Sequence, residues 1–570
     1  MPPPPSSKGA PARITVEAGV AGLAGLALAL AMSWPLVLHL GRDIGKDTGD
    51  PLFQTWQVAW IGHAVWRQPL ELFQANIFWP LADTLAFSDA LVGYAPAGLV
   101  AQLGPHAALV VYNLLFVFAY ALAFFGAYLL ARELGAGRAG AVAAGAAFAY
   151  APWRLTQSGH LHVLSSGGLP LSLFLLVRGH RSGSAALVLG GWLVVSWQMT
   201  LGFTLGLQLA YLIAALAVVA AVARRRGRLA PATARMLAAT SIGVGALVLV
   251  TVLMSRPYFR VVAEHPEARR TPAEIERFSP TLRSFLAVPR QSFLADIPFS
   301  ESSSLSDPDE RSLFPGLTIA LLALAGLTAC VYSRGLRLGL AAGVTLCAAL
   351  SLGLRDAAGA EAYVTPYRLL YEFAPGWDAI RTPGRINTLT SLGLALLAGA
   401  GVCALAERFR RLVGGAGRSW SRVVPAGFAA LLVAAILTEG LGPLAHPRVP
   451  KPPPGQRDAA APQLHLPWGF YDLRFTYWST AGFPSIVNGA GGFFPAAFDR
   501  LWLRVQGFPD ARSVAALRTV GVRTVVLHPE LTTGTPWQGA ATRSTAALDL
   551  DRKRVGRVVL YRLSRRDPGG

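Results

Sequence analysis

Long runs of apolar residues, separated by short polar segments, occupy most of the chain up to position 441. A helix that crosses the hydrocarbon core of a bilayer needs about 20 predominantly apolar residues. The runs therefore predict a mainly α polytopic membrane protein with about eleven transmembrane helices. The predicted spans are 14–40, 107–132, 139–152, 163–178, 184–199, 201–223, 233–254, 313–332, 336–354, 386–406 and 423–441.

Arginine clusters, such as Arg224–Arg228, lie in alternate loops between these runs. Cytoplasmic loops carry an excess of Lys and Arg. With a cytoplasmic N-terminus, all the clusters fall inside only if the apolar stretch 89–104 does not cross the membrane. Gly93, Pro96 and Gly98 in that stretch favour a broken interfacial or re-entrant helix. The segments predicted to face outward are 41–106, 152–162, 255–312, 355–385 and the region from about 442.

Composition and charge support this interpretation. Hydrophobic residues make up 53% of the chain and charged residues 14%, whereas soluble domains carry roughly 25% charged residues. A net charge of +20 would suggest nucleic-acid binding in a soluble protein. Here the basic residues flank apolar runs, so we attribute the charge to cytoplasmic loops. The predicted partner is the lipid bilayer and not a nucleic acid.

The two ends of the chain differ in composition from the apolar region 14–441. Residues 1–13 predict a disordered Pro-rich arm. A Pro-rich linker, Pro447–Pro454, leads into the remainder of 442–570, which has the pattern of a small extracytoplasmic α/β domain. A helix is predicted from Asp510, its N-cap, to Val520. The predicted strands are 463–466, 523–528 and 557–563.

The first outer loop, GRDIGKDTGDPLFQTWQVAWIGHAVW, places carboxylates directly after the first span. A sugar transferase needs a carboxylate that deprotonates or orients the acceptor hydroxyl, close to the headgroup depth of a lipid-linked donor. Asp47 and Asp50 are candidates. Alternatively, Asp50 is a helix N-cap followed by Pro51 at the first helical position, and Asp47 belongs to a turn. Trp56 and Trp60 follow on a predicted interfacial helix.

The second outer segment, APWRLTQSGHLHVLSS, contains two histidines and an arginine. His160 and His162, together with a loop carboxylate, have the donor atoms for a divalent cation. The alternative is that they are polar side chains near a helix start. Arg154 is a candidate ligand for a lipid phosphate, or an anchor at the headgroups.

The segment PYRLLYEFAPGWDAIRTPGRINTLT puts arginines on the predicted outer side, against the usual charge bias. Arginine binds phosphate bidentately, so Arg381 and Arg385 are candidates for holding a donor phosphate. The alternative is pairing with Asp378 or Glu372. The Ser/Asp/Glu-rich stretch from Ser300 to Arg311 is interpreted as a solvated loop, with a flexible lid over a site as the alternative.

Seven stretches carry a resemblance to a known family: SWPLVLHLG, GDPLFQTWQVAWIGHAV, ANIFWPLADTLAFSDALVG, AYAPWRLTQSGHLHVLSSGGLPL, PYRLLYEFAPGWDAIRTPGRI, FTYWSTAGFPSIVNGAGGFFP and LRTVGVRTVVLHP. The chain resembles, over nearly its whole length, a broad family of bacterial membrane proteins described as GT-C-like glycosyltransferases. The resemblance implies a GT-C-like helix arrangement, an acidic residue in the first outer loop and interfacial helices after it. It also implies a multi-pass protein of the bacterial plasma (inner) membrane.

The position that matches the family's acidic residue is Asp50, with Asp47 as the alternative. The usual Asp-Glu or Asp-x-Asp pair is interrupted here by Thr48-Gly49. Where some relatives carry a second acidic residue, this chain has His160 and His162. These departures leave a requirement for Mg or Mn open.

The resemblance implies transfer of a hexosyl or pentosyl group from a polyprenyl-phosphate donor to an envelope glycan, lipid or protein on the outer face of the membrane. Asp50 would activate the acceptor hydroxyl, and Arg381 or Arg385 would hold the donor phosphate. Trp56 and Trp60 would seat the isoprenoid or the interfacial helix. Two alternatives are a transporter or flippase of lipid-linked glycan and a non-catalytic envelope assembly protein. Few ionisable residues lie at mid-membrane depth, which argues against coupled transport.

Overall fold

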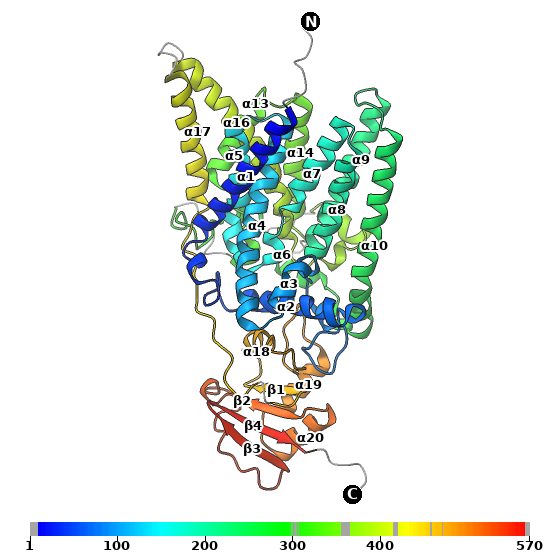
Figure 1. Cartoon of the computed structure of the whole chain (residues 1–570), viewed down its shortest axis with the longest axis vertical. Helices are drawn as coiled ribbons and strands as arrows, with labels where there is room; N and C mark the ends of the chain where they lie inside the picture. Colours follow the sequence, from blue (N-terminus) through cyan, green and yellow to red (C-terminus); the bar gives the residue numbers. More distant parts are fainter. Residues whose placement is uncertain are drawn as a thin grey trace. The chain divides into compact units, whose positions relative to one another are not determined.

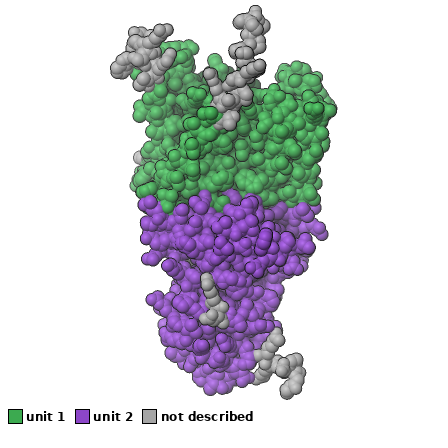
Figure 2. Space-filling model, viewed as in Figure 1, with its two compact units in different colours: residues 1–37, 115–251, 270–444 green, residues 38–114, 252–269, 445–570 purple. Residues whose placement is uncertain are grey.

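The computed structural model divides the chain into two compact units, which Figure 2 shows in different colours. The first unit contains residues 1–37, 115–251 and 270–444, and the second contains 38–114, 252–269 and 445–570. Of the predicted N-terminal arm, residues 1–9 lie outside the described part of the chain, and a helix begins at Ala10. The structure describes residues 10–297, 300, 305, 307–354, 365–413, 420–456, 459–469 and 471–564.

Each of the eleven predicted spans contains a helix (Figure 1). These helices are α1 (Ala10–Met32), α4 (Pro105–Leu134), α5 (Arg138–Tyr150), α7 (Gly168–Ser182), α8 (Ala185–Leu201), α9 (Phe203–Arg225), α10 (Ala234–Glu264), α13 (Leu317–Thr328), α14 (Arg334–Ser351), α16 (Asn387–Val413) and α17 (Trp420–Glu439). Five helical stretches are long and apolar enough to cross a membrane, by length and composition: Pro105–Leu134, Leu161–Ser182, Phe203–Arg225, Ala234–Glu264 and Pro383–Leu412. The chain is therefore a mostly helical, multi-pass membrane protein. The count of eleven spans stays a prediction.

Small residues bring the helices of the first unit into backbone contact. A Cβ atom on Gly140 of α5 would lie 2.3 Å from the carbonyl oxygen of Gly399 in α16. A Cβ atom on Gly326 of α13 would lie 2.0 Å from the carbonyl oxygen of Leu397, also in α16. Neither position has room for a side chain. The short helices α5 and α13 thus pack closely against the long helix α16, as their Gly and Ala content predicts.

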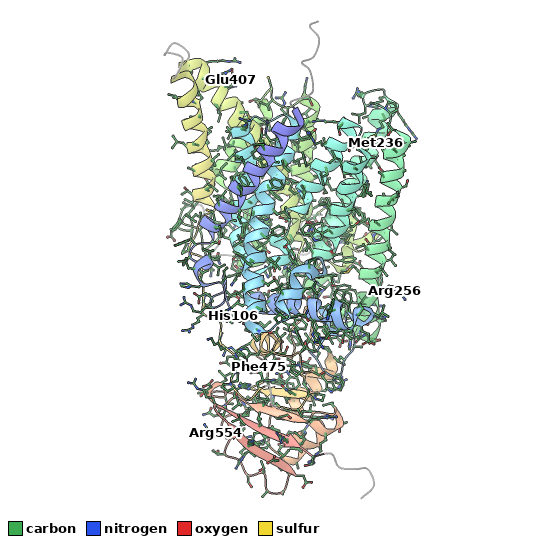
Figure 3. The ribbon with its side chains drawn as sticks, in the orientation of Figure 1. His106, Met236, Arg256, Glu407, Phe475 and Arg554 are labelled. Carbon is green, nitrogen blue, oxygen red and sulfur yellow. The ribbon has the colours of Figure 1, made fainter. Side chains whose placement is uncertain are left out.

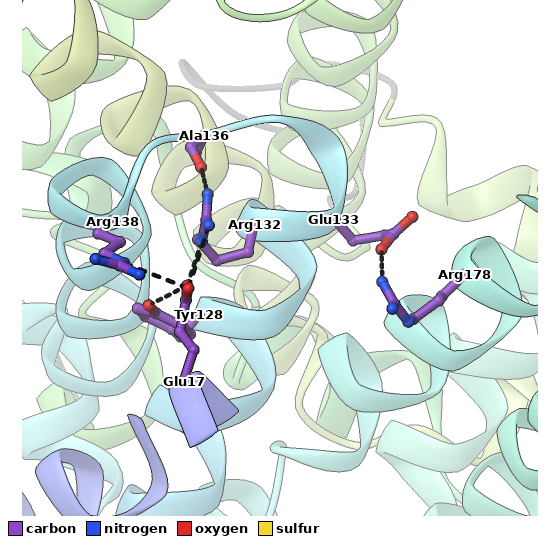
Figure 4. A network of polar contacts seen from close by, with 7 residues as sticks. All are labelled: Glu17, Tyr128, Arg132, Glu133, Ala136, Arg138 and Arg178. Atoms are coloured by element: carbon purple, nitrogen blue, oxygen red, sulfur yellow. Dashed lines mark hydrogen bonds and ion pairs between the residues drawn. The ribbon is translucent and has the colours of Figure 1, made fainter. Parts of the chain in front are cut away.

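An ionic network joins three helix ends of the first unit (Figure 4). Glu17 of α1 accepts hydrogen bonds from Arg132 Nε at 2.6 Å and from the Tyr128 hydroxyl at 2.9 Å, both in α4. Arg138, at the start of α5, lies 3.3 Å from the same carboxylate. The beginning of α1 therefore lies beside the loop between α4 and α5. The predicted topology also puts these two segments on one side of the membrane, and the assignment of that side to the cytoplasm stays a prediction.

In the second unit, two helices of the first outer loop pack together through glycines. They are α2 (Asp50–Arg67) and α3 (Ala95–Ala101), and α3 follows a 3₁₀ turn, η5 (Val92–Tyr94). A Cβ atom on Gly62 of α2 would lie only 1.9 Å from the carbonyl oxygen of Gly98 in α3. The predicted broken segment 89–104 is thus a 3₁₀ turn and a short helix.

The start of the first outer loop pairs with the segment that leads into the C-terminal region. Asp43 and Arg448 form an antiparallel β-bridge. The amide of Ile44 donates to the Pro447 carbonyl at 3.1 Å, and the amide of Val449 donates to the Arg42 carbonyl at 2.8 Å. The predicted domain boundaries separate 442–570 from this loop, whereas the structure groups 445–570 with 38–114 and 252–269. The predicted domain boundaries stay a prediction.

The C-terminal region contains a four-stranded sheet with the order β1-β2-β4-β3. Strands β1 and β2 are parallel, and β4 is antiparallel to both β2 and β3. The predicted helix α20 is present, and the Asp510 carboxylate accepts the Ser513 amide at 2.7 Å as its N-cap. Strand β3 and helices α18 and α19 are additions to the prediction. The elements are β1 (Gln463–Leu466), α18 (Asp472–Trp478), α19 (Ala496–Val505), α20 (Ala511–Thr519), β2 (Thr524–Leu527), β3 (Leu550–Val555) and β4 (Val558–Leu563).

A buried polar network connects β1 and α18. The Asn488 side chain donates to Asp472 Oδ1 at 2.8 Å and to the His465 carbonyl at 2.9 Å. His465 Nδ1 lies 3.1 Å from His528 Nε2, and Phe475 (Figure 3) stacks on both histidine rings. Burial raises the pKa of Asp472 to about 8, although the hydrogen bond from Asn488 opposes the rise. Asp472 is therefore mostly protonated at neutral pH.

This raised pKa makes stability depend on pH. The unfolded chain releases the Asp472 proton near pH 4, whereas the folded chain keeps it until about pH 8, so stability falls as pH rises between these values. Below pH 6.5 the buried His465 and His528, whose pKa values burial lowers, give the opposite slope. Between pH 6.5 and 8, the pH dependence of stability in this network therefore comes mainly from Asp472.

We expect the opening free energy of β1 and α18 to fall by up to about 1.4 kcal/mol per pH unit in that window. Hydrogen-exchange mass spectrometry of the full-length protein, corrected for intrinsic exchange, measures it. The variant Asp472→Asn should lose most of the slope. The exposed Asp499→Asn, in the same region, should keep it. An unchanged slope in Asp472→Asn would contradict the assignment.

Candidate functional site

Asp43 is the first of three carboxylates, with Asp47 and Asp50, in the segment that we call the acidic loop, and it has a structural role. Asp43 is 6% exposed and accepts two hydrogen bonds from Arg42, at 2.9 and 2.8 Å. These bonds lower the pKa of Asp43 against the opposing effect of burial. The side chain of Asn113 donates to the Asp43 carbonyl at 2.8 Å. Asp43 therefore fixes the start of the loop.

The two candidate catalytic carboxylates differ in their local bonding. Asp47 Oδ1 accepts the amide of Gly49 at 2.8 Å, which is the turn bonding that the sequence suggests. Asp50 is the first residue of α2, and Gly49 occupies the N-cap position. The alternative prediction that Asp50 is the N-cap and Pro51 the first helical residue is therefore wrong by one position. Both carboxylates are exposed.

The tryptophans predicted to contact lipid are buried. Trp56 is 0% exposed, and its Nε1 donates to Asn76 Oδ1 at 2.9 Å. Trp60 is 4% exposed, and its Nε1 donates to the Leu72 carbonyl at 3.0 Å. Their four-residue spacing places them on one helix face, and that face packs inward. Trp66 is the tryptophan of α2 that is exposed.

In the first unit, a cluster of four side chains contains the carboxylate of Glu310, the guanidinium of Arg385 and two histidines. Glu310, in α12 (Pro308–Arg311), accepts a hydrogen bond from Arg385 at 2.8 Å. Arg385, in η11 (Pro383–Ile386), also lies 2.9 Å from His162 Nε2. His160 Nε2 lies 3.6 Å from Glu310. Burial alone would raise the pKa of Glu310, but Arg385 and His160 hold it well below its usual range.

Sequence analysis did not identify Glu310. It interpreted the stretch from Ser300 to Arg311 as a solvated loop, but Pro308–Arg311 is helical and the Glu310 side chain is 12% exposed. Residues 301–304 and 306 of that stretch lie outside the described residues. Pro308, followed by acidic residues, is a helix-start signal that could have located α12. No local signal indicates its partner, Arg385, 75 residues away.

A second arginine extends this cluster. Burial and the nearby Arg270 and Arg385 lower the pKa of Arg381, and Phe278 lies under its guanidinium at 5.1 Å. Arg270 pairs with Glu274 at 2.9 Å. The guanidiniums of Arg270, Arg381 and Arg385 thus lie in the same neighbourhood as the carboxylates of Glu274 and Glu310. Because guanidiniums bind phosphate groups, this cluster is a candidate anion site.

The predicted alternative pairing holds for a different arginine of the same segment. Arg368 pairs with Glu372 at 2.9 Å on the surface, whereas Arg385 pairs with Glu310. The part of the predicted outer loop at 355–364 lies outside the described residues.

The arrangement of His160 and His162 does not fit a divalent cation. The guanidinium of Arg385 already bonds both His162 and Glu310, so a positive group occupies the position between these two potential ligands. Among the described residues, no group of three or more His, Cys, Asp or Glu side chains is arranged to hold a metal. A requirement for Mg or Mn stays a prediction.

Arg154 lies in a different environment from Arg381 and Arg385. It is 1% exposed and donates to Ser166 Oγ and to the Leu164 carbonyl, both at 3.0 Å. Its guanidinium lies 5.4 Å from the ring centroid of Tyr120. Burial lowers the pKa of Arg154, and the groups that oppose this effect are tyrosines and not carboxylates. Of the three arginines predicted to bind phosphate, Arg381 and Arg385 thus belong to one cluster, and Arg154 lies in a different environment.

Comparison with known proteins gives matches only at the level of structure. No family model and no curated protein sequence matches the chain. The arabinofuranosyltransferase AftD from Mycobacteria matches with TM-scores of 0.55 and 0.56 in two conformational classes, at 16% identity, over 97% of this chain and 42% of AftD. The chain thus spans less than half the length of AftD. An oligosaccharyltransferase from Archaeoglobus fulgidus matches with a TM-score of 0.45 at 11% identity, over 92% of this chain and 70% of that protein.

The similarity to AftD identifies the fold. The chain has the fold of the part of AftD that it matches, which agrees with the GT-C-like helix arrangement that the sequence resemblance implies. At 16% identity the similarity concerns the fold alone, because one fold can carry different functions.

The ion pair at the centre of the cluster can be tested by mutation. We expect Glu310→Gln to destabilise the first unit by about 3–5 kcal/mol, because it leaves a buried guanidinium without its counter-charge. Thermal unfolding of the detergent-solubilised protein measures the change. Glu372→Gln, which breaks the exposed pair with Arg368, should cost less than about 0.5 kcal/mol. Equal small effects in both variants would refute a central role for the Glu310 pair.

Proposed function

We propose that the protein is a membrane glycosyltransferase that uses a polyprenyl-phosphate-linked sugar donor. Its acceptor is an envelope glycan, lipid or protein on the outer face of the bacterial plasma membrane. The GT-C-like fold supports this class of activity. The observation that carries the proposal is the exposed carboxylate of Asp50, in the first outer loop, whose side chain is not the cap of α2.

Asp50 is assigned as the base in a single inverting displacement. The acceptor hydroxyl loses its proton to the Asp50 carboxylate as its oxygen attacks C1 of the donor sugar. The bond between C1 and the phosphate oxygen breaks, and polyprenyl phosphate leaves with the bonding electrons. Asp47 is the alternative base, and one of its carboxylate oxygens accepts the Gly49 amide.

Arg381 and Arg385 are assigned to the donor phosphate. Their guanidiniums would bind the phosphodiester and stabilise the additional negative charge that develops on the leaving phosphate. Glu310 orients Arg385 through the hydrogen bond at 2.8 Å. Trp56 and Trp60 are too buried to seat the isoprenoid directly, so we assign them to holding α2 in place.

The proposal predicts that one carboxylate of the acidic loop is essential. Mass spectrometry compares envelope glycans and glycolipids in strains that lack the protein or carry wild type, Asp50→Asn or Asp47→Asn at matched membrane levels. We expect Asp50→Asn to reduce transfer at least about 100-fold, so that it loses the same sugar as the deletion strain. Asp47→Asn should keep most of the activity, because an amide oxygen still accepts the Gly49 amide.

Two other outcomes of this comparison would contradict parts of the proposal. If the sugar persists in Asp50→Asn but is absent from the deletion strain, Asp50 is not the base, and a transport or scaffold role gains support. If the deletion strain has unchanged glycans, the transferase proposal fails.

A further inference from the structure

A small cavity in the first unit lies beside Arg154. Its volume is about 30 Å³, and a single water molecule needs about 10–15 Å³ by the same measure. Its polar lining residues include Arg154, Tyr120, Tyr150 and Ser33. Its apolar lining residues include Met32, Phe116, Leu155, Leu441 and Leu444. The cavity therefore combines a charged donor with a wall that suits a hydrocarbon chain.

The charge of Arg154 has no carboxylate to balance it among the described residues. Its two printed hydrogen bonds go to neutral acceptors, Ser166 Oγ and the Leu164 carbonyl. Its Nε is buried without a hydrogen-bond partner in the described structure. A buried guanidinium that lacks a counter-charge is costly, so proteins pair such groups or use them to bind an anion.

Tyrosine hydroxyls add further donors to the same wall. The hydroxyl of Tyr150 is buried without a hydrogen-bond partner in the described part of the chain, and Tyr150 is 4% exposed. Its ring stacks on that of Tyr120 at a centroid distance of 5.4 Å, and Arg154 lies over the Tyr120 ring. Hydroxyl and guanidinium donors around a small space match the acceptor oxygens of a phosphate group.

We propose that this cavity binds a phosphate oxyanion, carried by the headgroup of a lipid whose chain lies along the apolar wall. The site is separate from the donor site assigned to Arg381 and Arg385. The residues that line the cavity include neither Arg381 nor Arg385. The inference goes beyond the transferase proposal and does not depend on it.

The test measures thermal unfolding of the full-length protein in detergent. One arm adds phosphatidic acid in mixed micelles, with diacylglycerol as the uncharged control, and a second arm adds inorganic phosphate. The variants are Tyr150→Phe, which removes one hydroxyl donor, and Arg154→Gln, which removes the charge. Tyr332→Phe is the matched control, because the Tyr332 hydroxyl is also buried without a described partner but does not line the cavity.

We expect phosphatidic acid to stabilise wild type and Tyr332→Phe, and diacylglycerol to have no such effect. Tyr150→Phe should bind phosphatidic acid about tenfold more weakly, which corresponds to the loss of one hydrogen bond to a charged group. Arg154→Gln, if it folds, should lose the effect entirely. Tyr150-dependent stabilisation by inorganic phosphate alone would support the oxyanion site with a free anion as its source. The proposal is overturned if neither probe stabilises wild type, or if Tyr150→Phe responds as Tyr332→Phe does.

Discussion

Nearby negative charge stabilises a guanidinium that is taken out of water, and Glu310 supplies that charge to Arg385 in the first unit. Placing a charged group in a poorly solvated environment costs several kcal/mol unless a partner and further hydrogen bonds compensate. The 2.8 Å contact between these residues, with His162 at 2.9 Å from the same guanidinium, supplies the compensation. It also holds α12 against η11, which leads directly into the long helix α16.

The sequence predicts those features that depend on neighbours along the chain. Apolar runs identify the helices, and the cap at Asp510 and the β-branched residues of β2 identify two elements of the C-terminal region. The partner of Arg385 is not predictable in this way, because Glu310 is 75 positions away in a stretch of polar composition. The tryptophan pattern of α2 reveals an apolar face, but apolarity alone does not distinguish a face that packs on protein from one that contacts lipid.

Three arginines that look equivalent in the sequence acquire different electrostatic roles in the structure. Arg385 shares its guanidinium with Glu310, so an anion that approaches it competes with a permanent carboxylate. Competition of this kind weakens binding and speeds release, which is the behaviour that the proposed transferase requires for its leaving phosphate. Arg154 has only neutral hydrogen-bond acceptors and aromatic rings among its described contacts, and this environment favours an anion that stays bound.

The bridge between Asp43 and Arg448 has a consequence for biosynthesis. It joins positions about 400 residues apart, so the acidic loop cannot adopt its final backbone pairing until nearly all the apolar helices have left the ribosome. At about 5–20 residues per second, that interval is about 20–80 s. During this time the loop that carries Asp50 lacks its closing contacts. Assembly of the acidic loop is therefore a late event that follows membrane insertion.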